Sequence, residues 1–391
     1  MSEGSVRVLQ VNKLYSPWIG GIETVAEDVA EYLKGKHGTI VTNLVCQPRG
    51  YRSIDSVNGV RTYRAASWGI FSGMPLSVDF FLLFRKLAKE ADVIILHHPF
   101  PLAFVAYRYF GFGRKVVVWY HSDIVRQTLS RIPFMPFIRF ALKRAASVIV
   151  SNRAITKQSR TLRAVSDRCR VVYFGVDDNK LISTPEVEKK AEMLRREYGT
   201  PLVLSVGRLV YYKGYEYLIE AMRDVPEANL LIIGNGKLRA ELEARVKSNG
   251  LTGRVHIIDP VDELAPYYHA CDVFALPSCE PSEVFGIVQI EAMACGKPVV
   301  NTALPTGVPE VSLDGKTGRT VPPKNSLALA TALREILSDR DEYSRLSRNA
   351  VIEVAERFTK QRFFANLDLA LAESPFLAKR RALRKASDTS L

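Results

Sequence analysis

The sequence predicts an α/β protein with two doubly wound parallel sheets, in two Rossmann-like domains that face each other across a cleft. A chain of 391 residues exceeds one average domain, so two domains are expected. In both halves, short apolar runs alternate with amphipathic helical patterns. This alternation is typical of parallel sheets covered by helices on both faces, which bind ligands at the carboxyl ends of their strands.

Each half can be divided into strands and helices in order. In the first half, strands are expected at residues 6–11, 40–46, 93–96, 116–119, 148–150 and 171–174, and helices at 22–34, 76–89, 137–145 and 154–162. In the second half, strands are expected at 202–206, 230–233, 255–258, 273–276 and 299–300, and helices at 215–222, 237–247, 262–270, 286–294, 325–337, 342–358 and 360–372.

These elements define the domain boundaries. Residues 1–182 form the N-terminal domain and residues 200–358 the C-terminal domain. Residues 183–199 are polar and charged, with Pro185 near their start, which favours a linker. A helix at residues 359–375 is expected to cross back to the N-terminal domain, and residues 376–391 form a basic tail.

The net charge of +13 lies in the first half of the chain. Residues 1–180 hold 26 Lys and Arg against 13 Asp and Glu, whereas the remainder holds 28 of each. A basic half predicts an anionic partner, which could be a lipid surface, a phosphorylated acceptor or nucleic acid.

Cysteine usage and hydropathy predict the compartment. The five cysteines are scattered and contain no C-x-x-C pair, which favours reduced thiols over a disulfide framework or a zinc site. The chain does not open with a basic stretch followed by a long apolar run, and no window approaches the length of a membrane span. We therefore expect a cytoplasmic protein.

The most informative stretch is residues 278–300, which read SCEPSEVFGIVQIEAMACGKPVV. Glu283 and Glu291 lie on either side of Phe285-Gly286, where an amphipathic helix is expected to begin. A helix N-terminus offers unpaired N–H groups and a positive dipole end, which suit a diphosphate. Glu283 can accept hydrogen bonds from sugar hydroxyls, and Glu291 can hold a ribose. The stretch therefore predicts a nucleotide-sugar site.

A second motif, GRLVYYKG at residues 207–214, follows a strand and precedes a helix. Gly207 permits a sharp turn, after which Arg208 and Lys213 can reach the cleft and neutralise a diphosphate leaving group. Two solvated cations in a loop would produce the same pattern. Gly234 opens a GNG turn that lacks the third glycine of a dinucleotide fingerprint, and we expect it to lie beside the nucleotide.

The first half offers its own candidates. Gly20-Gly21 follows the first strand and could let the backbone approach a phosphate or sugar, although a plain helix-entry loop fits equally. His121 lies one residue past a strand end, and His97-His98 has the same place after another strand. Two such placements in one domain favour a role in the cleft, with His121 the better candidate.

Basic, aromatic-rich segments point to a membrane. Residues 76–89 and 131–144 mix aromatic and basic side chains at near-helical spacing, and residues 378–385 form a further basic cluster. Core helices whose cations reach past them to water would explain each segment alone. Together with the charge asymmetry they predict contact with anionic lipid.

Two motifs resemble a metal site and a phosphate-binding loop, but their positions in the sequence do not fit either. Residues 339–341 read Asp-Arg-Asp, a pattern that some transferases use for a metal, but they join two helices far from any strand end. Residues 315–317 read Gly-Lys-Thr like the end of a Walker A loop, but Glu310 stands where that loop needs glycine. We predict no metal ion and no cofactor.

The chain resembles the retaining glycosyltransferases of family 4, which have the GT-B fold, over nearly its whole length. The resemblance is carried by GRLVYYKG, GNG, Glu283 followed by Phe-Gly and Glu291, and TGVPEV followed by GKTG. Thr306 stands where many members have a second glycine before Gly307. The run NTALPTGVPEV is similar to members that act on GDP-mannose or a related deoxyhexose.

The resemblance implies roles for individual residues. Glu283 would bind the donor-sugar hydroxyls and Glu291 the ribose. The amides around Phe285, Gly286 and Ile287 would meet the diphosphate.

It implies further roles on both sides of the site. Arg208 and Lys213 would neutralise the diphosphate, while Gly20, Gly21 and His121 would form the N-domain side. Retention without an obvious nucleophile suggests a front-face displacement, in which the departing phosphate oxygen takes the acceptor's proton.

The expected function is a retaining hexosyltransferase that uses a nucleotide-sugar, with GDP-mannose favoured, to extend a lipid-linked glycan in cell-surface polysaccharide or lipopolysaccharide synthesis. Its expected partners are the donor, a lipid-linked saccharide acceptor and an anionic membrane surface, without nucleic acid. A UDP-sugar donor is the alternative. Epimerases and phosphorylases of this architecture need other catalytic groups, and an oxidoreductase would need a full dinucleotide fingerprint. A nucleic-acid binder would explain the charge but not Glu283 and Glu291.

Overall fold

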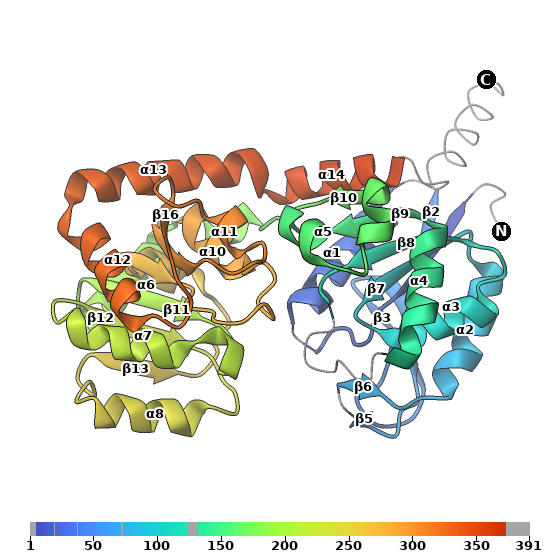
Figure 1. The fold of residues 1–391 in the computed structure, drawn as a ribbon, viewed down its shortest axis with the longest axis horizontal. Helices are drawn as coiled ribbons and strands as arrows, with labels where there is room; N and C mark the ends of the chain where they lie inside the picture. The colour runs from blue at the N-terminus through green and yellow to red at the C-terminus, as the bar shows by residue number, and fades with distance from the viewer. Residues whose placement is uncertain (1–4, 19, 37, 72, 124–131, 373–391) are drawn as a thin grey trace. The chain divides into compact units, whose positions relative to one another are not determined.

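The computed structural model describes residues 5–372 apart from residues 19, 37, 72 and 124–131. The chain divides into two compact units, of which the first is Met1–Val172 with Phe364–Leu391 and the second is Tyr173–Phe363. Within each unit, helices lie on both sides of a mostly parallel sheet (Figure 1). The predicted α/β class with two doubly wound sheets is therefore confirmed.

The sheet of the first unit has the strand order β10-β9-β8-β7-β1-β2-β4-β3. Its strands are β1 (Val6–Val11), β2 (Thr39–Cys46), β3 (Ser53–Val57), β4 (Val60–Ala65), β7 (Val93–His98), β8 (Lys115–Tyr120), β9 (Ala145–Val150) and β10 (Cys169–Val171). Neighbours pair in parallel except β3 and β4, which are antiparallel at the sheet edge. The strand order reverses between β1 and β7, and open α/β sheets bind ligands at such a point.

Alternate residues of these strands face opposite helix layers. Leu9 and Val11 share a core with α2 (Asp79–Glu90), α3 (Pro101–Phe110) and α4 (Met135–Arg144). On the other face, the Gln10 side chain donates to the Ala26 carbonyl of α1 (Gly21–Gly35) at 2.7 Å. Helix α14 (Lys360–Ala372) packs on α1, where the rings of Phe364 and Tyr32 stack with centres 4.0 Å apart.

The sheet of the second unit is parallel throughout, in the order β13-β12-β11-β14-β15-β16. Its strands are β11 (Leu202–Val206), β12 (Asn229–Ile233), β13 (Val255–Ile258), β14 (Val273–Ala275), β15 (Val299–Thr302) and β16 (Gly318–Val321). Its helices include α6 (Pro185–Tyr198), α7 (Tyr215–Ala221), α8 (Arg239–Ser248), α9 (Ala265–Ala270), α10 (Ile287–Ala294), α11 (Val308–Val311), α12 (Ser326–Ser338) and α13 (Arg340–Arg357). Here the strand order reverses between β11 and β14, which places a ligand edge after these two strands.

The domain boundary differs from the sequence-based expectation. The second unit begins at Tyr173, and residues 183–199, which we expected to be a linker, hold helix α6 within that unit. Thr184 caps this helix by accepting a hydrogen bond from the Val187 N–H at 3.3 Å. Val187 and Ala191 are its buried residues, so its otherwise charged sequence concealed a narrow apolar face.

Smaller elements also differ. The expected strand at residues 171–174 overlaps β10 only at Val171. The sequence patterns did not predict α3, the β3–β4 pair, β16, α11 or a short hairpin of β5 (Ile70–Phe71) and β6 (Met74–Pro75). The basic tail at 376–391, including the cluster at 378–385, lies outside the described residues. Among the residues described, no helix is both long and apolar enough to cross a bilayer.

Candidate active site

The carboxyl ends of β11 and β14 carry the residues predicted for the donor side. These strands are neighbours, with Leu204 opposite Phe274, so the loops that follow them meet at one edge of the sheet. The loops bond directly, since the Cys279 N–H donates to the Tyr212 carbonyl at 2.8 Å. The sheet order therefore joins two motifs that are far apart in the sequence.

A buried ion pair connects the two loops. Lys213 Nζ lies 2.6 Å from Glu283 Oε2, and each residue is only 8% exposed. Ser278 donates its hydroxyl to the same carboxylate oxygen at 3.0 Å. Burial acts to lower the pKa of Lys213, but the adjacent Glu283 carboxylate outweighs it and the pKa lies above its usual value. The site therefore keeps an ammonium charge at a strand end.

Arg208 lies on the same loop but outside this pair. Its side chain is exposed, and Nη2 donates to the Tyr212 hydroxyl at 2.9 Å. Gly207 directly precedes it, and a Cβ at that position would lie 3.1 Å from Lys213 Nζ. Glycine therefore leaves room for the lysine side chain, while Arg208 remains on the solvent side of the loop.

Helix α10 begins directly after Phe285-Gly286, as the sequence predicts. Gly286 has a φ of 74°, in the left-handed region that favours glycine. A Cβ there would also lie 2.5 Å from Leu276 Cδ2. Ile287 is the first residue of the helix, so the backbone amides from Phe285 to Ile287 form its N-terminal end.

A buried glutamine holds this turn from inside. Gln289 Nε2 donates to the Phe285 carbonyl at 2.8 Å and to the Val308 carbonyl at 3.2 Å. Its oxygen accepts a hydrogen bond from Asn301 Nδ2 at 3.1 Å. Because these groups are buried together, they fix the helix start against the neighbouring strand.

Glu291 lies within α10, beyond the helix start. The Tyr268 hydroxyl donates to its Oε2 at 2.6 Å. Burial raises the pKa of Glu291, although the Tyr268 hydrogen bond opposes the shift. The Tyr268 hydroxyl therefore orients the Glu291 carboxylate, whereas the Glu283 carboxylate is paired with the Lys213 ammonium.

Gly234 has a packing role that the sequence did not reveal. A Cβ at Gly234 would lie 1.9 Å from the Gly207 carbonyl oxygen, and one at Gly236 would lie 2.4 Å from the Leu209 oxygen. The Leu209 N–H also donates to the Asn235 carbonyl at 2.9 Å. The GNG turn therefore supports the loop that carries Arg208 and Lys213, and contact with a nucleotide stays a prediction.

In the first unit, two histidines meet at the ends of β7 and β8. His97 Nδ1 lies 2.9 Å from His121 Nε2, and both rings stack near Trp119. Burial lowers the pKa of His97 to about 3, and burial together with the neighbouring histidines lowers the pKa of His121 well below its usual range. Both imidazoles are therefore neutral, and one donates to the other.

The segment after His121 is fixed by side chains. His98 Nδ1 lies 2.8 Å from the Ser122 carbonyl oxygen. The hydroxyls of Tyr120 and Ser159 both donate to the Asp123 carboxylate, the latter at 2.9 Å. His121 therefore lies between a paired histidine and an anchored loop.

Gly20-Gly21 forms the entry to α1. The Gly20 carbonyl accepts hydrogen bonds from the Thr24 N–H at 3.0 Å and from its hydroxyl at 3.1 Å. A Cβ at Gly21 would meet open space. The geometry matches the helix-entry interpretation, and a ligand role for these glycines stays a prediction.

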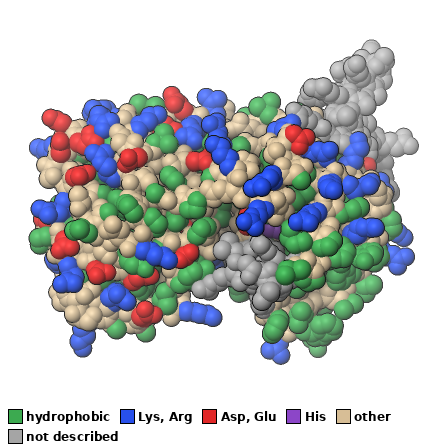
Figure 2. All heavy atoms as spheres, viewed as in Figure 1, with side chains coloured by type: hydrophobic (Ala, Val, Ile, Leu, Met, Phe, Trp, Pro, Cys, Tyr) green, Lys and Arg blue, Asp and Glu red, His purple; other side chains and the backbone are tan. Residues whose placement is uncertain are grey.

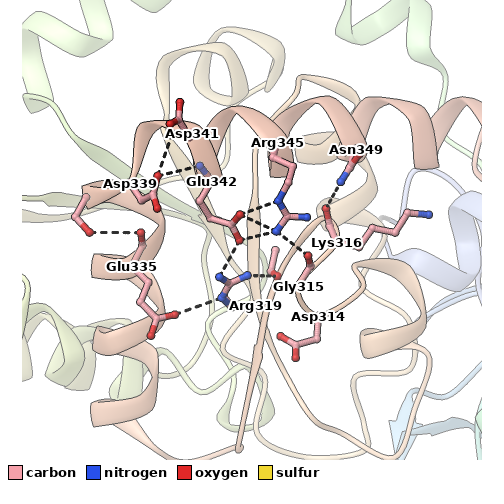
Figure 3. Close-up of polar contacts among 12 residues, drawn as sticks. Asp314, Gly315, Lys316, Arg319, Glu335, Asp339, Asp341, Glu342, Arg345 and Asn349 are labelled. Carbon is pink, nitrogen blue, oxygen red and sulfur yellow. Dashed lines mark hydrogen bonds and ion pairs between the residues drawn. The ribbon is translucent and has the colours of Figure 1, made fainter.

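The two motifs that we set aside have structural roles (Figure 3). Asp339 caps α13 by accepting hydrogen bonds from the N–H groups of Asp341 and Glu342, both at 3.0 Å. The Gly315 carbonyl accepts a hydrogen bond from Arg345 at 3.0 Å. Lys316 Nζ lies 2.6 Å from the buried Glu353 carboxylate. Asp339, Gly315 and Lys316 therefore all make contacts within the second unit.

Three supporting residues were not predicted from the sequence, namely Ser278, Gln289 and Tyr268. Ser278 lies in the loop after β14, three residues past the strand end, whereas His121 directly follows β8. Gln289 and Tyr268 carry no strand-end signal, because their role depends on which helix and strand pack together. Within the described part of the chain, no group of three or more His, Cys, Asp or Glu could hold a metal ion.

Protein-family models match both units. Residues 19–180 match the family described as Glycosyltransferase Family 4, and residues 186–352 match Glycosyl transferases group 1. Together the two matches cover most of the chain.

Curated relatives and a solved structure agree with these matches. The D-rhamnosyltransferase WbpZ of Pseudomonas aeruginosa is 29% identical over 359 residues, which are 90% of this chain and 92% of that protein. The O-antigen chain mannosyltransferase C of Escherichia coli is 26% identical over 94% of this chain and 100% of its own length. Anabaena HepE, solved with UDP, has a TM-score of 0.77 over 94% of this chain and 100% of its own, at 21% identity. That structural likeness shows a shared fold.

Proposed function

We propose that this chain, which belongs to the family 4 glycosyltransferases with the GT-B fold, is a retaining enzyme that transfers a hexose from a nucleotide-sugar to a lipid-linked glycan. Mannose from GDP-mannose is the favoured donor, which agrees with the sugars and the O-antigen chain named in its relatives. The observation that carries the proposal is the buried Lys213–Glu283 pair beside the N-terminal end of α10. A cation, a carboxylate and the backbone amides of a helix N-terminus lie around one sheet edge.

The second unit would hold the donor. Lys213 and Arg208 would neutralise the diphosphate, and the amides from Phe285 to Ile287 would bind its oxygens. Glu283 would accept hydrogen bonds from the sugar hydroxyls, and Glu291 from the ribose. Lys213 can bind Glu283 and the diphosphate at the same time, because an ammonium has three N–H donors and its contact with Glu283 uses one of them.

The chemical step would be a front-face displacement. The bond from the anomeric carbon to the diphosphate oxygen breaks, and the acceptor oxygen bonds to the same face of that carbon. The acceptor's proton passes to the departing phosphate oxygen, so no side-chain base is assigned. Lys213 and Arg208 would stabilise the negative charge that develops on that oxygen.

The first unit would hold the acceptor. A neutral His121 can donate a hydrogen bond to a sugar hydroxyl or accept one from it. It does so without placing a positive charge near the anomeric carbon. Gly20 and Gly21 would let the backbone approach the donor. We place the enzyme on the cytoplasmic face of an anionic membrane, since the excess positive charge lies in residues 1–180.

A ligand panel tests the donor assignment. GDP-mannose and GDP should raise the unfolding temperature of the purified protein, because a ligand that binds only the folded state stabilises it. UDP-glucose and UDP-N-acetylglucosamine should have smaller effects. A larger shift with the UDP-sugars would move the assignment to a UDP-dependent member of the family. No shift with any nucleotide-sugar, together with tight and salt-dependent DNA binding, would overturn the enzyme assignment.

A further inference from the structure

The first unit exposes a cluster of large apolar side chains around the β5–β6 hairpin and the start of α2. Figure 2 shows hydrophobic side chains gathered over this part of the unit, with basic side chains around them. Trp68 is 73% exposed and Phe71 is 71% exposed. We define the hairpin surface by its exposed apolar residues, which are Tyr51, Trp68, Phe71, Leu76, Val78 and Leu82.

Backbone and side-chain bonds hold this surface in place. Phe71 pairs with Met74 across the hairpin, and the Trp68 N–H donates to the Leu76 carbonyl at 3.0 Å. Gly50 and Ser67 exchange two backbone hydrogen bonds of 2.9 Å, which brings Tyr51 beside the hairpin.

The hairpin is also tied to the start of α2. The Asp79 carboxylate accepts hydrogen bonds from the Ala66 N–H at 2.9 Å and from Arg52 Nε at 3.0 Å. The apolar side chains therefore project from a backbone that hydrogen bonds hold in place.

Helix α2 extends the same surface with cations. Its inward face is apolar and buried, whereas Val78, Leu82 and Lys86 follow one another at four-residue spacing on the exposed side. Arg85 and Lys89 are exposed beside them. The surface is thus apolar at the hairpin and positively charged along the helix.

We propose that the hairpin surface docks the enzyme on a bilayer of anionic phospholipid. Aromatic side chains favour the membrane interface, and lysine and arginine are attracted to anionic headgroups. A second copy of this chain fits less well, because pairing two such faces would bring Arg85, Lys86 and Lys89 against the same cations. The inference rests on the proposed function, since a lipid-linked acceptor requires an enzyme held at the membrane.

Vesicle flotation tests the surface directly, in the absence of donor and acceptor. The full chain should float with vesicles of phosphatidylcholine and phosphatidylglycerol, but not with phosphatidylcholine alone, and binding should weaken as salt rises. The W68S/F71S variant should lose about tenfold or more in partitioning, because two aromatic anchors are removed. The control is Leu327→Ser in α12, whose side chain is 69% exposed on the second unit, and it should float as the wild type does.

Fluorescence identifies which residue enters the bilayer. The chain contains three tryptophans, at positions 18, 68 and 119. Vesicles with brominated acyl chains should quench the wild type and Trp18→Phe, but should quench Trp68→Phe much less.

Some outcomes would overturn the inference: flotation of W68S/F71S equal to the wild type, unchanged quenching in Trp68→Phe, or a vesicle-independent dimer that this variant abolishes. Hydrolysis of GDP-mannose by W68S/F71S separates the two proposals. Donor turnover with lost flotation supports both, whereas flotation without any nucleotide-sugar binding leaves the docking surface and removes the proposed function.

Discussion

Each unit places a buried polar pair at the carboxyl ends of neighbouring strands, but the two pairs differ in charge. In the first unit, His97 and His121 are 2.9 Å apart, and burial keeps both neutral. In the second unit, Lys213 and Glu283 are 2.6 Å apart, and the lysine stays charged although it is also buried. The partner decides the outcome, because a carboxylate compensates for the lost hydration of an ammonium and an imidazole does not do so for another imidazole.

The difference divides the chemistry. A neutral imidazole pair suits uncharged sugar hydroxyls, whereas a retained ammonium suits a diphosphate. The same strand-end geometry can thus suit two different kinds of chemical group. The following experiments either remove one member of a pair or vary the pH, because the two pairs differ in charge.

The largest effect is expected from Lys213→Met. Transfer from the nucleotide-sugar should fall by about 10²–10³-fold, or about 3–4 kcal/mol in the barrier, because one preorganised donor to the leaving group is lost. Arg208→Met should have an effect of similar size. The measurement is kcat/KM with a saccharide acceptor.

Lys316→Met is a matched control for Lys213→Met. It breaks another lysine–glutamate pair in the same unit, with the same 2.6 Å separation. Glu353 keeps Arg357 as a partner, and neither residue lies at the ligand edge. Transfer by Lys316→Met should match the wild type. If Lys213→Met also retained full transfer, the assigned role of the lysine would be wrong.

Stability should follow the charge left behind in the second unit. Lys213→Met buries the Glu283 carboxylate without its cation, so the free energy of unfolding should fall by about 3 kcal/mol. Adding Glu283→Gln should recover most of that loss of stability, since the amide carries no charge, while transfer stays as low as in Lys213→Met or lower. Denaturant unfolding of both variants measures this. Equal stability of the single and double variants would contradict a charged pair.

Acid should affect the first unit by a different route. The pKa of His97 is lowered to about 3 and that of His98 to about 4, whereas an unfolded histidine titrates near 6.5. Below pH ~6.5 the unfolded chain binds protons that the folded chain does not. Stability is therefore complete above that pH, and it should fall by about 1.4 kcal/mol per histidine for each unit of further acidification.

Unfolding measured at pH 7, 6 and 5 tests this dependence. His97→Asn and His98→Asn should each reduce the slope of the free energy of unfolding against pH by the contribution of one histidine, about 1.4 kcal/mol per pH unit. The raised pKa of Lys213 keeps that residue charged across the same range, so its contribution stays until the solution becomes strongly alkaline. A slope unchanged by His97→Asn would mean that this histidine is charged in the folded protein.

The sequence singled out the two loops that carry Lys213 and Glu283 for a physical reason. Lys213 and Glu283 each combine a charge with a nearby glycine after an apolar strand, a pattern that local sequence displays. Their contact depends on β11 lying beside β14, which no local pattern contains. The family resemblance implied the pairing of these loops, and the family matches confirm that resemblance.

Other features could not be predicted from local patterns. Gln289 resembles an ordinary polar residue in an apolar helix until its buried partners at Phe285 and Val308 are known. Helix α6 resembled a linker because only a narrow face of it is buried. The hairpin at Ile70–Pro75 is too short for a periodic signal, and Trp68, the most exposed tryptophan described, lies just before it.

The smallest effect should come from the hydrogen bond between the two histidines. His97→Leu removes the partner of His121 Nε2 and should lower the free energy of unfolding by about 1 kcal/mol. Transfer should fall about fivefold, because the His121 ring loses one of the contacts that orient it. His97→Asn places an amide near the former Nδ1 position and should restore most of the transfer rate.

His98 provides the comparison for that variant. His98 is as buried as His97, but it bonds to the Ser122 carbonyl and not to His121. His98→Leu should therefore reduce stability, and adding His97→Asn to that variant should not restore it. If His97→Leu transferred as fast as the wild type, His97 would only fill space. If both leucine variants lost the same stability but only His97→Leu lost transfer, the hydrogen bond to His121 would be the part of the neutral pair that the reaction uses.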